Sequence, residues 1–330
     1  MEERKKDHIN QAFDARIGVE EADTRFNYEP LLAPHPSEPL PPTLFAGKTL
    51  RLPVWVSSMT GGTEQAGNIN RNLARACKEF GMGMGLGSCR ILLDDDRHFS
   101  DFDVRDIIGE EQPLYANLGI AQLEQLLKSD RVTEIEALVK RLRADGLIIH
   151  VNPLQEAFQP EGDRLENAPL ETLEAFLAQT RLKVIVKEVG QGMGPESLRA
   201  LLNLPLEAIE FGALGGTNFT RLELARHSAN DTQLMEDFAK VGHTAEEMTA
   251  TVNRLIEEEV HPACRHLIIS GGIQSALQGY RLTKLSHLPA IFGMGSGFLK
   301  HASGDYKTLQ AYVQQIEKVL LLANQYLRAK

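Results

Sequence analysis

Four polar residues follow one apolar run of the chain and could form a chemical site together. His150 and Asn152 end the segment GLIIHVN, and Gln155 and Glu156 come shortly after it. A lone histidine in such a position is more often a hydrogen-bonded core residue, but four polar side chains in close succession favour a site. The carboxylate of Glu156 is a hard oxygen ligand, which suits Mg²⁺ beside a phosphate. We therefore expect a polar site here, with Glu156 as a metal ligand.

A single lysine interrupts the apolar run Val184–Val189. Side chains alternate between the two faces of a strand, so Lys187 shares a face with Ile185 and points into the interior. Burying an ammonium group is unfavourable unless an anion accompanies it. A structural ion pair with a carboxylate is one explanation. We prefer the other, in which Lys187 meets a bound ligand.

Two glycine-rich segments each follow an apolar run and lead into a helical pattern. They are Ser270–Ile273 (SGGI) and Gly293–Gly297 (GMGSG). Small residues let backbone N–H groups approach a phosphate closely, although tight turns alone would also require glycine. We favour a phosphate site because of where these segments lie in the fold that the rest of the sequence predicts.

Short β-rich runs at regular intervals predict a fold that brings these residues together. The predicted strands are Trp55–Ser58, Gly83–Ser88, Leu114–Leu118, Gly146–Val151, Val184–Val189, Ala208–Leu214, His266–Ser270 and Ala290–Met294. Helical patterns lie between most of them, and most strands start about 25–35 residues apart, the size of a βα unit. Eight such units form a (β/α)8 TIM barrel, in which chemistry takes place at the carboxyl ends of the strands and phosphate often binds after strands seven and eight. A doubly wound open sheet is the alternative, but no early GxGxxG supports it.

The chain outside the eight units is expected to form an N-terminal extension. We assign residues 1–54 to an arm and strap and residues 55–330 to the barrel. Pro30–Pro42 holds six of the fifteen prolines and should be extended or turn-like. In the long interval between the sixth and seventh strands, the charged segment Gly242–Glu259 is expected to form an extra exposed helix or lid. A final amphipathic helix is predicted over roughly Tyr306–Leu327.

The overall charge and the cysteines limit the class of protein. The 330 residues carry 35 Lys and Arg against 45 Asp and Glu, a formal net charge of −10, which argues against nucleic acid as a partner. No apolar run approaches the ~18 residues of a membrane span, and the charged N-terminus leads into no secretory signal. Cys77, Cys89 and Cys264 lack metal-ligand spacing, so a reducing compartment is expected. These features predict a cytoplasmic protein that binds neither nucleic acid nor membrane.

A series of short motifs along nearly the whole chain resembles type 2 isopentenyl-diphosphate isomerase, an FMN-dependent (β/α)8 enzyme. The motifs are RKKDHI at Arg4–Ile9, MTGG at Met59–Gly62, GSCR at Gly87–Arg90, NLG at Asn117–Gly119, HVNPLQEAFQPEGD at His150–Asp163, KEVG at Lys187–Gly190, GGTNF at Gly215–Phe219, SGGI at Ser270–Ile273 and GMGSGFLK at Gly293–Lys300. The stretch His150–Asp163 is highly specific, whereas SGGI alone would fit many flavin barrels.

The resemblance implies an enzyme that moves a double bond between isopentenyl and dimethylallyl diphosphate. Gln155, His150 and Asn152 are the catalytic candidates, and Glu156 matches the Mg²⁺ ligand. The residues that match substrate contacts are Arg4, Lys5, Arg90 and Gln155. Without the resemblance, the charged run around Arg4 could be either a solvated basic tip or an arm that clamps a diphosphate. The implied FMN contacts are Ser58, Met59, Thr60, Ser88, Asn117, Lys187, Thr217, Gly271, Gly272, Gly295 and Ser296.

The resemblance also implies cofactors and an assembly. FMN, reduced by NADPH or NADH, would act as the acid–base group, with Lys187 stabilising its charged ring edge. A homotetramer or homo-octamer is expected.

The alternatives to the isomerase function are an FMN-dependent oxidoreductase on the same barrel and a non-catalytic flavin- or phosphate-binding protein. One departure is Cys89 in GSCR, where family members often carry glutamine.

Overall fold

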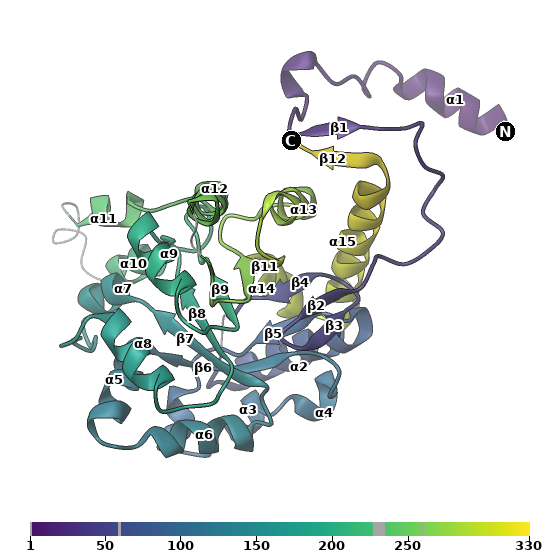
Figure 1. The fold of residues 1–330 in the computed structure, drawn as a ribbon. Helices are drawn as coiled ribbons and strands as arrows, with labels where there is room; N and C mark the ends of the chain where they lie inside the picture. Colours follow the sequence, from purple (N-terminus) through teal and green to yellow (C-terminus); the bar gives the residue numbers. More distant parts are fainter. Residues whose placement is uncertain (1, 59–60, 227–234, 259–260) are drawn as a thin grey trace.

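A closed parallel barrel forms the centre of the computed structural model, which describes residues 2–58, 61–226, 235–258 and 261–330 (Figure 1). Within these residues the barrel strands are β4 (Val54–Val56), β5 (Gly83–Gly85), β6 (Leu114–Gly119), β7 (Gly146–Val151), β8 (Val184–Glu188), β9 (Ala208–Glu210), β10 (His266–Ile269) and β11 (Ala290–Met294). Each strand pairs with the next along the chain, and β11 pairs with β4 to close the barrel. The predicted (β/α)8 barrel is confirmed. Several strands end earlier than predicted, where polar and glycine residues leave the sheet for the loops.

The side chains inside the barrel form two layers, because alternate residues of a strand face inward. The lower layer is apolar and buried, and consists of Trp55, Tyr115, Ile148, Ile185, Ala208, Ile268 and Ile291. Two residues further along the same strands, the corresponding positions are Ser57, Asn117, His150, Lys187, Glu210, Ser270 and Gly293. The barrel therefore has an apolar base and a polar layer below its carboxyl end.

Helices surround the barrel and cover the outward faces of its strands. They are α2 (Glu64–Phe80), α5 (Ile120–Lys128), α6 (Val132–Arg141), α8 (Pro169–Leu177), α9 (Pro195–Leu202), α12 (Ala245–Glu257), α13 (Ala276–Leu285) and α15 (Tyr306–Tyr326). Outward residues such as Val54, Val56 and Ile209 belong to the large apolar core between strands and helices. The last helix, α15, packs against α2, α13 and α14 (Ser296–Ala302) and confirms the predicted final helix. In the described part of the chain, no helix is long and apolar enough to cross a membrane.

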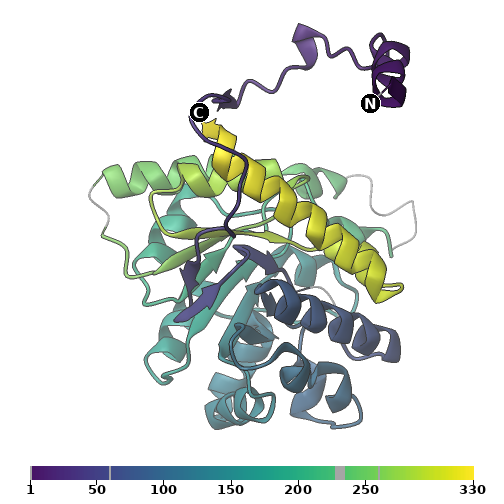
Figure 2. The same ribbon diagram turned by 90° about the vertical axis from the view of Figure 1, so that its right-hand side faces the viewer.

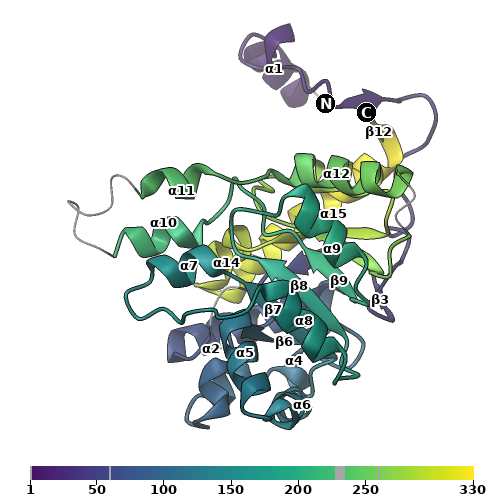
Figure 3. The ribbon, with the colours of Figure 1, turned by 60° about the vertical axis from the view of Figure 1, so that its left-hand side comes forward.

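Shorter helices lie in the connections after the strands. They are η2 (Arg90–Leu93), α3 (Phe99–Phe102), α4 (Arg105–Ile108), α7 (Pro153–Phe158), α10 (Phe219–Leu224) and α11 (Glu236–Lys240). Helix α7 packs against α10, so the loop after the fourth barrel strand meets the loop after the sixth (Figure 3). This contact brings together residues that are far apart in the sequence.

The charged segment Gly242–Glu259 is not the exposed helix or lid that we predicted. It contains α12, which buries Met248, Val252 and Leu255 and packs between α9 and α13. Thr244 caps its start, because its hydroxyl accepts a hydrogen bond from the Glu247 backbone at 3.2 Å. The segment is therefore the barrel helix of the sixth unit. Its charges lie on the solvent face, and α10 and α11 are the additional elements of this connection.

The N-terminal segment runs along the outside of the barrel and ends in a separate helix, α1 (Glu2–Gln11), which stands clear of the barrel (Figures 1 and 2). A short turn, η1 (Val19–Glu21), leads to β1 (Phe26–Tyr28), which pairs antiparallel with β12 (Leu327–Ala329) beyond α15. The proline-rich strap follows without regular secondary structure. The hairpin of β2 (Thr43–Phe45) and β3 (Lys48–Leu50) then packs Phe45 and Leu50 under the apolar base.

Candidate active site

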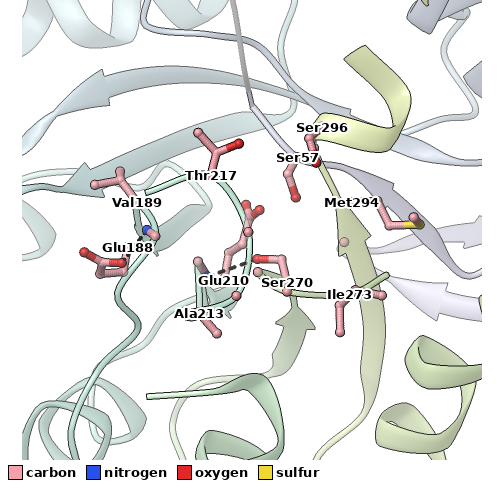
Figure 4. A pocket seen from close by; sticks show the side chains of 18 of the residues that line it. Ser57, Glu188, Val189, Glu210, Ala213, Thr217, Ser270, Ile273, Met294 and Ser296 are labelled. Atoms are coloured by element: carbon pink, nitrogen blue, oxygen red, sulfur yellow. Dashed lines mark hydrogen bonds between the residues drawn. The ribbon is translucent and has the colours of Figure 1, made fainter. Parts of the chain in front are cut away.

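A cavity of about 350 Å³ opens above the polar layer, at the carboxyl ends of β4, β8, β9, β10 and β11 (Figure 4). Its size lies within the range of ligand pockets. Many of the predicted cofactor residues line it: Ser58, Lys187, Thr217, Gly271, Gly272, Gly295 and Ser296. Residues from separate parts of the sequence therefore meet at the position that the barrel topology predicted.

The glycine segments of the cavity need glycine for steric reasons. Gly271 and Gly272 have φ values of +85° and +66°, where other residues are strained. A Cβ atom on Gly271 would lie 2.1 Å from the backbone nitrogen of Ala213, and one on Gly293 would lie 2.7 Å from the hydroxyl of Ser57. Tight packing thus explains these glycines in part, and it also leaves bare backbone at the cavity wall. Such a wall suits a phosphate or a flat ring system.

His150 is held in one orientation by Asn117 on the neighbouring strand. The amide nitrogen of Asn117 donates to the Leu86 carbonyl at 3.0 Å, so its oxygen is left to accept from His150 Nδ1 at 2.8 Å. Burial, together with the positive charge of Lys187, lowers the pKa of His150 to about 3. His150 is therefore neutral at neutral pH. It can position a substrate or accept a hydrogen bond through Nε2, but it is not a charged acid.

Asn152 organises the two neighbouring candidates at the start of α7. Its amide donates to Gln155 Oε1 at 3.1 Å and to Glu156 Oε1 at 2.9 Å. The other oxygen of Glu156 accepts from the backbone nitrogen of Asp163 at 2.8 Å. Within the described residues no group of three or more His, Cys, Asp or Glu side chains could hold a metal ion. Glu156 is therefore not part of a cluster of three or more such ligands in the part of the chain that the structure describes.

Two acidic residues that we did not predict support this cluster. Gln155 Nε2 donates to Glu223 of α10 at 3.2 Å, and Glu223 is in turn paired with Arg226 at 2.6 Å. Asp163 accepts from the predicted Arg90 at 2.9 Å. Asp163 is the last residue of the motif His150–Asp163, but it was not among the predicted site residues. Glu223 had no signal in the sequence, because only the contact between α7 and α10 brings it to Gln155.

Glu210 is a third acidic residue that we did not predict, although the sequence pattern indicates its inward position. It lies in the apolar run AIEFG two residues after Ala208, so the alternation that placed Lys187 inside also places Glu210 inside. Its side chain is fully buried, and neither carboxyl oxygen has a hydrogen-bond partner in the described structure. It lines the same cavity as Lys187.

Several predicted residues lie elsewhere. Arg4 and Lys5 are exposed on α1, which stands off beside β12, away from α7 and α10 (Figure 3). Ser88 and Arg90 line a separate shallow hollow next to the glycines of MTGG. Met59 and Thr60 lie outside the described residues. Within one copy of the chain, the structure therefore does not bring the arm to the cavity.

Cys89 stands near the carboxyl end of β5 but cannot serve as a nucleophile. Its side chain is fully buried, and burial raises the pKa of the thiol to about 12. The thiol donates to the Gly87 carbonyl at 3.4 Å. Cys89 therefore acts as a small packing residue.

We expect acidification to destabilise the protein through His150. The pKa of His150 falls from 6.5 to about 3 on folding. Between these two pH values His150 is therefore protonated in the unfolded chain and neutral in the folded one. Between these pH values the free energy of unfolding should fall by about 1.4 kcal/mol per pH unit from this group. His150→Gln should remove this part of the slope, and His8→Gln, at an exposed position, is the control. Urea denaturation over a pH series measures both. Parallel curves for wild type and His150→Gln would contradict the expectation.

Solved structures similar to this one confirm the barrel. A flavocytochrome b2 double variant with sulfite bound matches with a TM-score of 0.61 and 13% identity, covering 91% of this chain and 72% of that one. A mandelate oxidase variant with the monooxide FMN adduct matches with a TM-score of 0.53 and 15% identity, covering 91% and 83%. At such identities the likeness concerns the fold alone.

Curated relatives identify the family. No protein-family model matches the chain. An isopentenyl-diphosphate delta-isomerase of Rickettsia felis is 31% identical over 327 residues, which cover 95% of this chain and 89% of that protein. An isopentenyl-diphosphate delta-isomerase of Chlorobium phaeovibrioides is 32% identical and covers 85% and 79%. The chain described here belongs to the isopentenyl-diphosphate delta-isomerase family.

Proposed function

We propose that this protein interconverts isopentenyl and dimethylallyl diphosphate, using reduced FMN in the cavity above the polar layer. The observation that carries the proposal is the cavity itself. It has Lys187 in its floor and bare glycine backbone in its wall. The cluster around Gln155 follows the neighbouring strand β7 and lies outside the residues that line the cavity. The family membership supports the same reaction.

The residues of the cavity fit FMN. The backbone at Gly271–Gly272 and Gly295–Ser296 would hold the phosphate, and Lys187 would lie near the ring edge that becomes negative. The hydroxyls of Ser57 and Ser58 are buried without partners in the described structure, so the site has unused donors. When bound, reduced FMN supplies the group that gives and takes protons during the double-bond shift.

The polar cluster would hold the reacting end of the substrate. Gln155 is fixed from both sides, by Asn152 and by Glu223, which suits a positioning or relay role better than proton transfer by its own amide. The neutral His150 would offer Nε2 to the substrate. Glu156 would share Mg²⁺ with the substrate diphosphate, which supplies the remaining oxygen ligands. NADPH or NADH would reduce the flavin, and we place the reaction in the cytoplasm.

The arm would act on a neighbouring copy of the chain in a homotetramer or homo-octamer. Helix α1 and the segment after it make no extensive contact with the barrel, and they expose Ile9, Phe13, Ile17 and Val19. Around the far loops, Leu222, Phe238 and Val241 are also exposed. Packing of one apolar set on the other would carry Arg4 and Lys5 of one copy towards the cavity of the next, where they would bind the diphosphate.

The proposed reaction is tested on the purified protein. We expect denaturation to release FMN, and isopentenyl diphosphate to isomerise only after the flavin has been reduced. NADPH should be consumed once, for the reduction, and not once per turnover. Release of FAD, or no flavin at all, would contradict the proposal. Consumption of NADPH in proportion to substrate would instead favour an FMN-dependent oxidoreductase.

We expect substitutions of Glu156 and of Gln155 to impair the enzyme in different ways. Glu156→Gln keeps the size and polarity but removes the charge, so more Mg²⁺ should be needed and excess metal should restore part of the rate. Gln155→Ala should lower kcat with an unchanged Mg²⁺ dependence and FMN content, because the loss falls in the transition state. Titration of the rate with Mg²⁺ separates the two. The same metal response in both variants would show that the assigned roles are wrong.

We expect Arg4→Ala to raise KM about tenfold or more with normal FMN content, because a charge-assisted hydrogen bond contributes roughly 1.5–3 kcal/mol. Arg16→Ala, in the same arm, is the control. Mixing the Arg4→Ala and Gln155→Ala proteins then tests which site the arm serves. If it serves the neighbouring copy, mixed oligomers contain sites with both residues intact and should recover activity. An unchanged KM in Arg4→Ala would contradict the binding role, and no recovery on mixing would contradict exchange between copies.

A further inference from the structure

Glu210 is a buried acidic residue that has no role in the proposed reaction. Its carboxyl group points into the cavity between Ser57 and Ser270 (Figure 4). It is 0% exposed, and neither of its oxygens has a hydrogen-bond partner in the described structure. An unpaired buried carboxyl group is costly unless its surroundings compensate for it. A group that compensates for the burial of this carboxyl group is therefore expected among its neighbours.

Lys187 is that neighbour. It is the register partner of Glu210 across β8 and β9, so both side chains leave adjacent strands on the inward face. Lys187 is 7% exposed and donates to the Glu188 carbonyl at 3.1 Å, and it forms no ion pair within the described residues. A buried cation without a counter-charge is as unfavourable as the unpaired acid. Each group thus lacks what the other carries.

The other acid beside Lys187 is already engaged. The carboxylate of Glu188 accepts hydrogen bonds from three backbone nitrogens, those of Gly190, Gln191 and Gly192, at 2.6–2.9 Å. Glu210 has no such bonds. Burial raises the pKa of Glu210 above its usual range, and the charge of Lys187 and the nearby donors of Ser57, Ser270 and Trp55 offset part of that rise. These groups approach the carboxyl group from three other strands of the barrel, β4, β8 and β10.

We propose that Glu210 is the counter-charge of Lys187 and, through Lys187, sets how readily the bound flavin is reduced. This inference rests on the proposed binding of FMN. A lysine alone under the flavin would favour the reduced, negatively charged ring strongly. A carboxylate beside the lysine moderates that preference, because it cancels part of the positive potential. Glu210 is thus a positioning residue that acts through Lys187.

The reduction potential of the flavin tests the proposal directly. Glu210→Gln keeps the shape and removes the charge, so reduction should become at least about tenfold more favourable, which is about 30 mV for a two-electron couple. Glu210→Asp keeps the charge and should shift the equilibrium much less. The control is Glu207→Gln, which changes a buried acid just before the same strand, about 10 Å away. That change should alter the equilibrium less than twofold. An unchanged potential in a Glu210→Gln protein with full FMN content would overturn the proposal.

Infrared spectroscopy provides a second readout that needs neither flavin nor activity. The proposal expects Glu210 to be ionised in the flavin-free protein at neutral pH, so no carbonyl band of a buried carboxylic acid should change in Glu210→Asp. A protonated-acid band in the wild type that moves in Glu210→Asp would overturn it, even if Glu210→Gln does not fold. If the purified protein binds no flavin, the proposed function fails, whereas the infrared measurement still decides the charge of Glu210.

Discussion

The alternation of side chains along eight parallel strands is the constraint on which the rest of this structure depends. Each strand points every second residue into the closed barrel, and the interior is too narrow to hold anything but side chains at its base. An apolar layer fills that base, from Trp55 on β4 to Ile291 on β11. The next inward positions must then be either small or polar, because they border the open end. Function is thus confined to one layer and the loops above it.

This confinement explains why Lys187, Glu210 and His150 can influence one another. Their strands, β7, β8 and β9, are adjacent, and the three side chains stand at one height in the barrel. In this buried layer, desolvation first and the nearby charge of Lys187 second lower the pKa of His150.

Much of this arrangement could be predicted from the sequence, since period-two runs and their regular spacing report strands directly. The eight strands, the inward position of Lys187 and the glycine walls were predicted on that basis. Glu210 carried the same signal and was overlooked. Glu223 could not be found, because its role arises from a contact between α7 and α10 that no local pattern encodes. The charge of Gly242–Glu259 predicted an exposed helix, but the acidic residues of α12 lie near its two ends on the solvent face, and Met248, Val252 and Leu255 form its buried face.

The pairing of β1 with β12 links the first and the last segments of the chain, with Phe26 opposite Ala329. During synthesis β1 emerges before the barrel strands, whereas its partner β12 is made after them. The barrel strands can therefore pair while the strap is still untethered, and loop closure across almost the entire chain comes at the end. The β1–β12 pair anchors the arm, so the arm takes its position only after β12 has been synthesised and has paired.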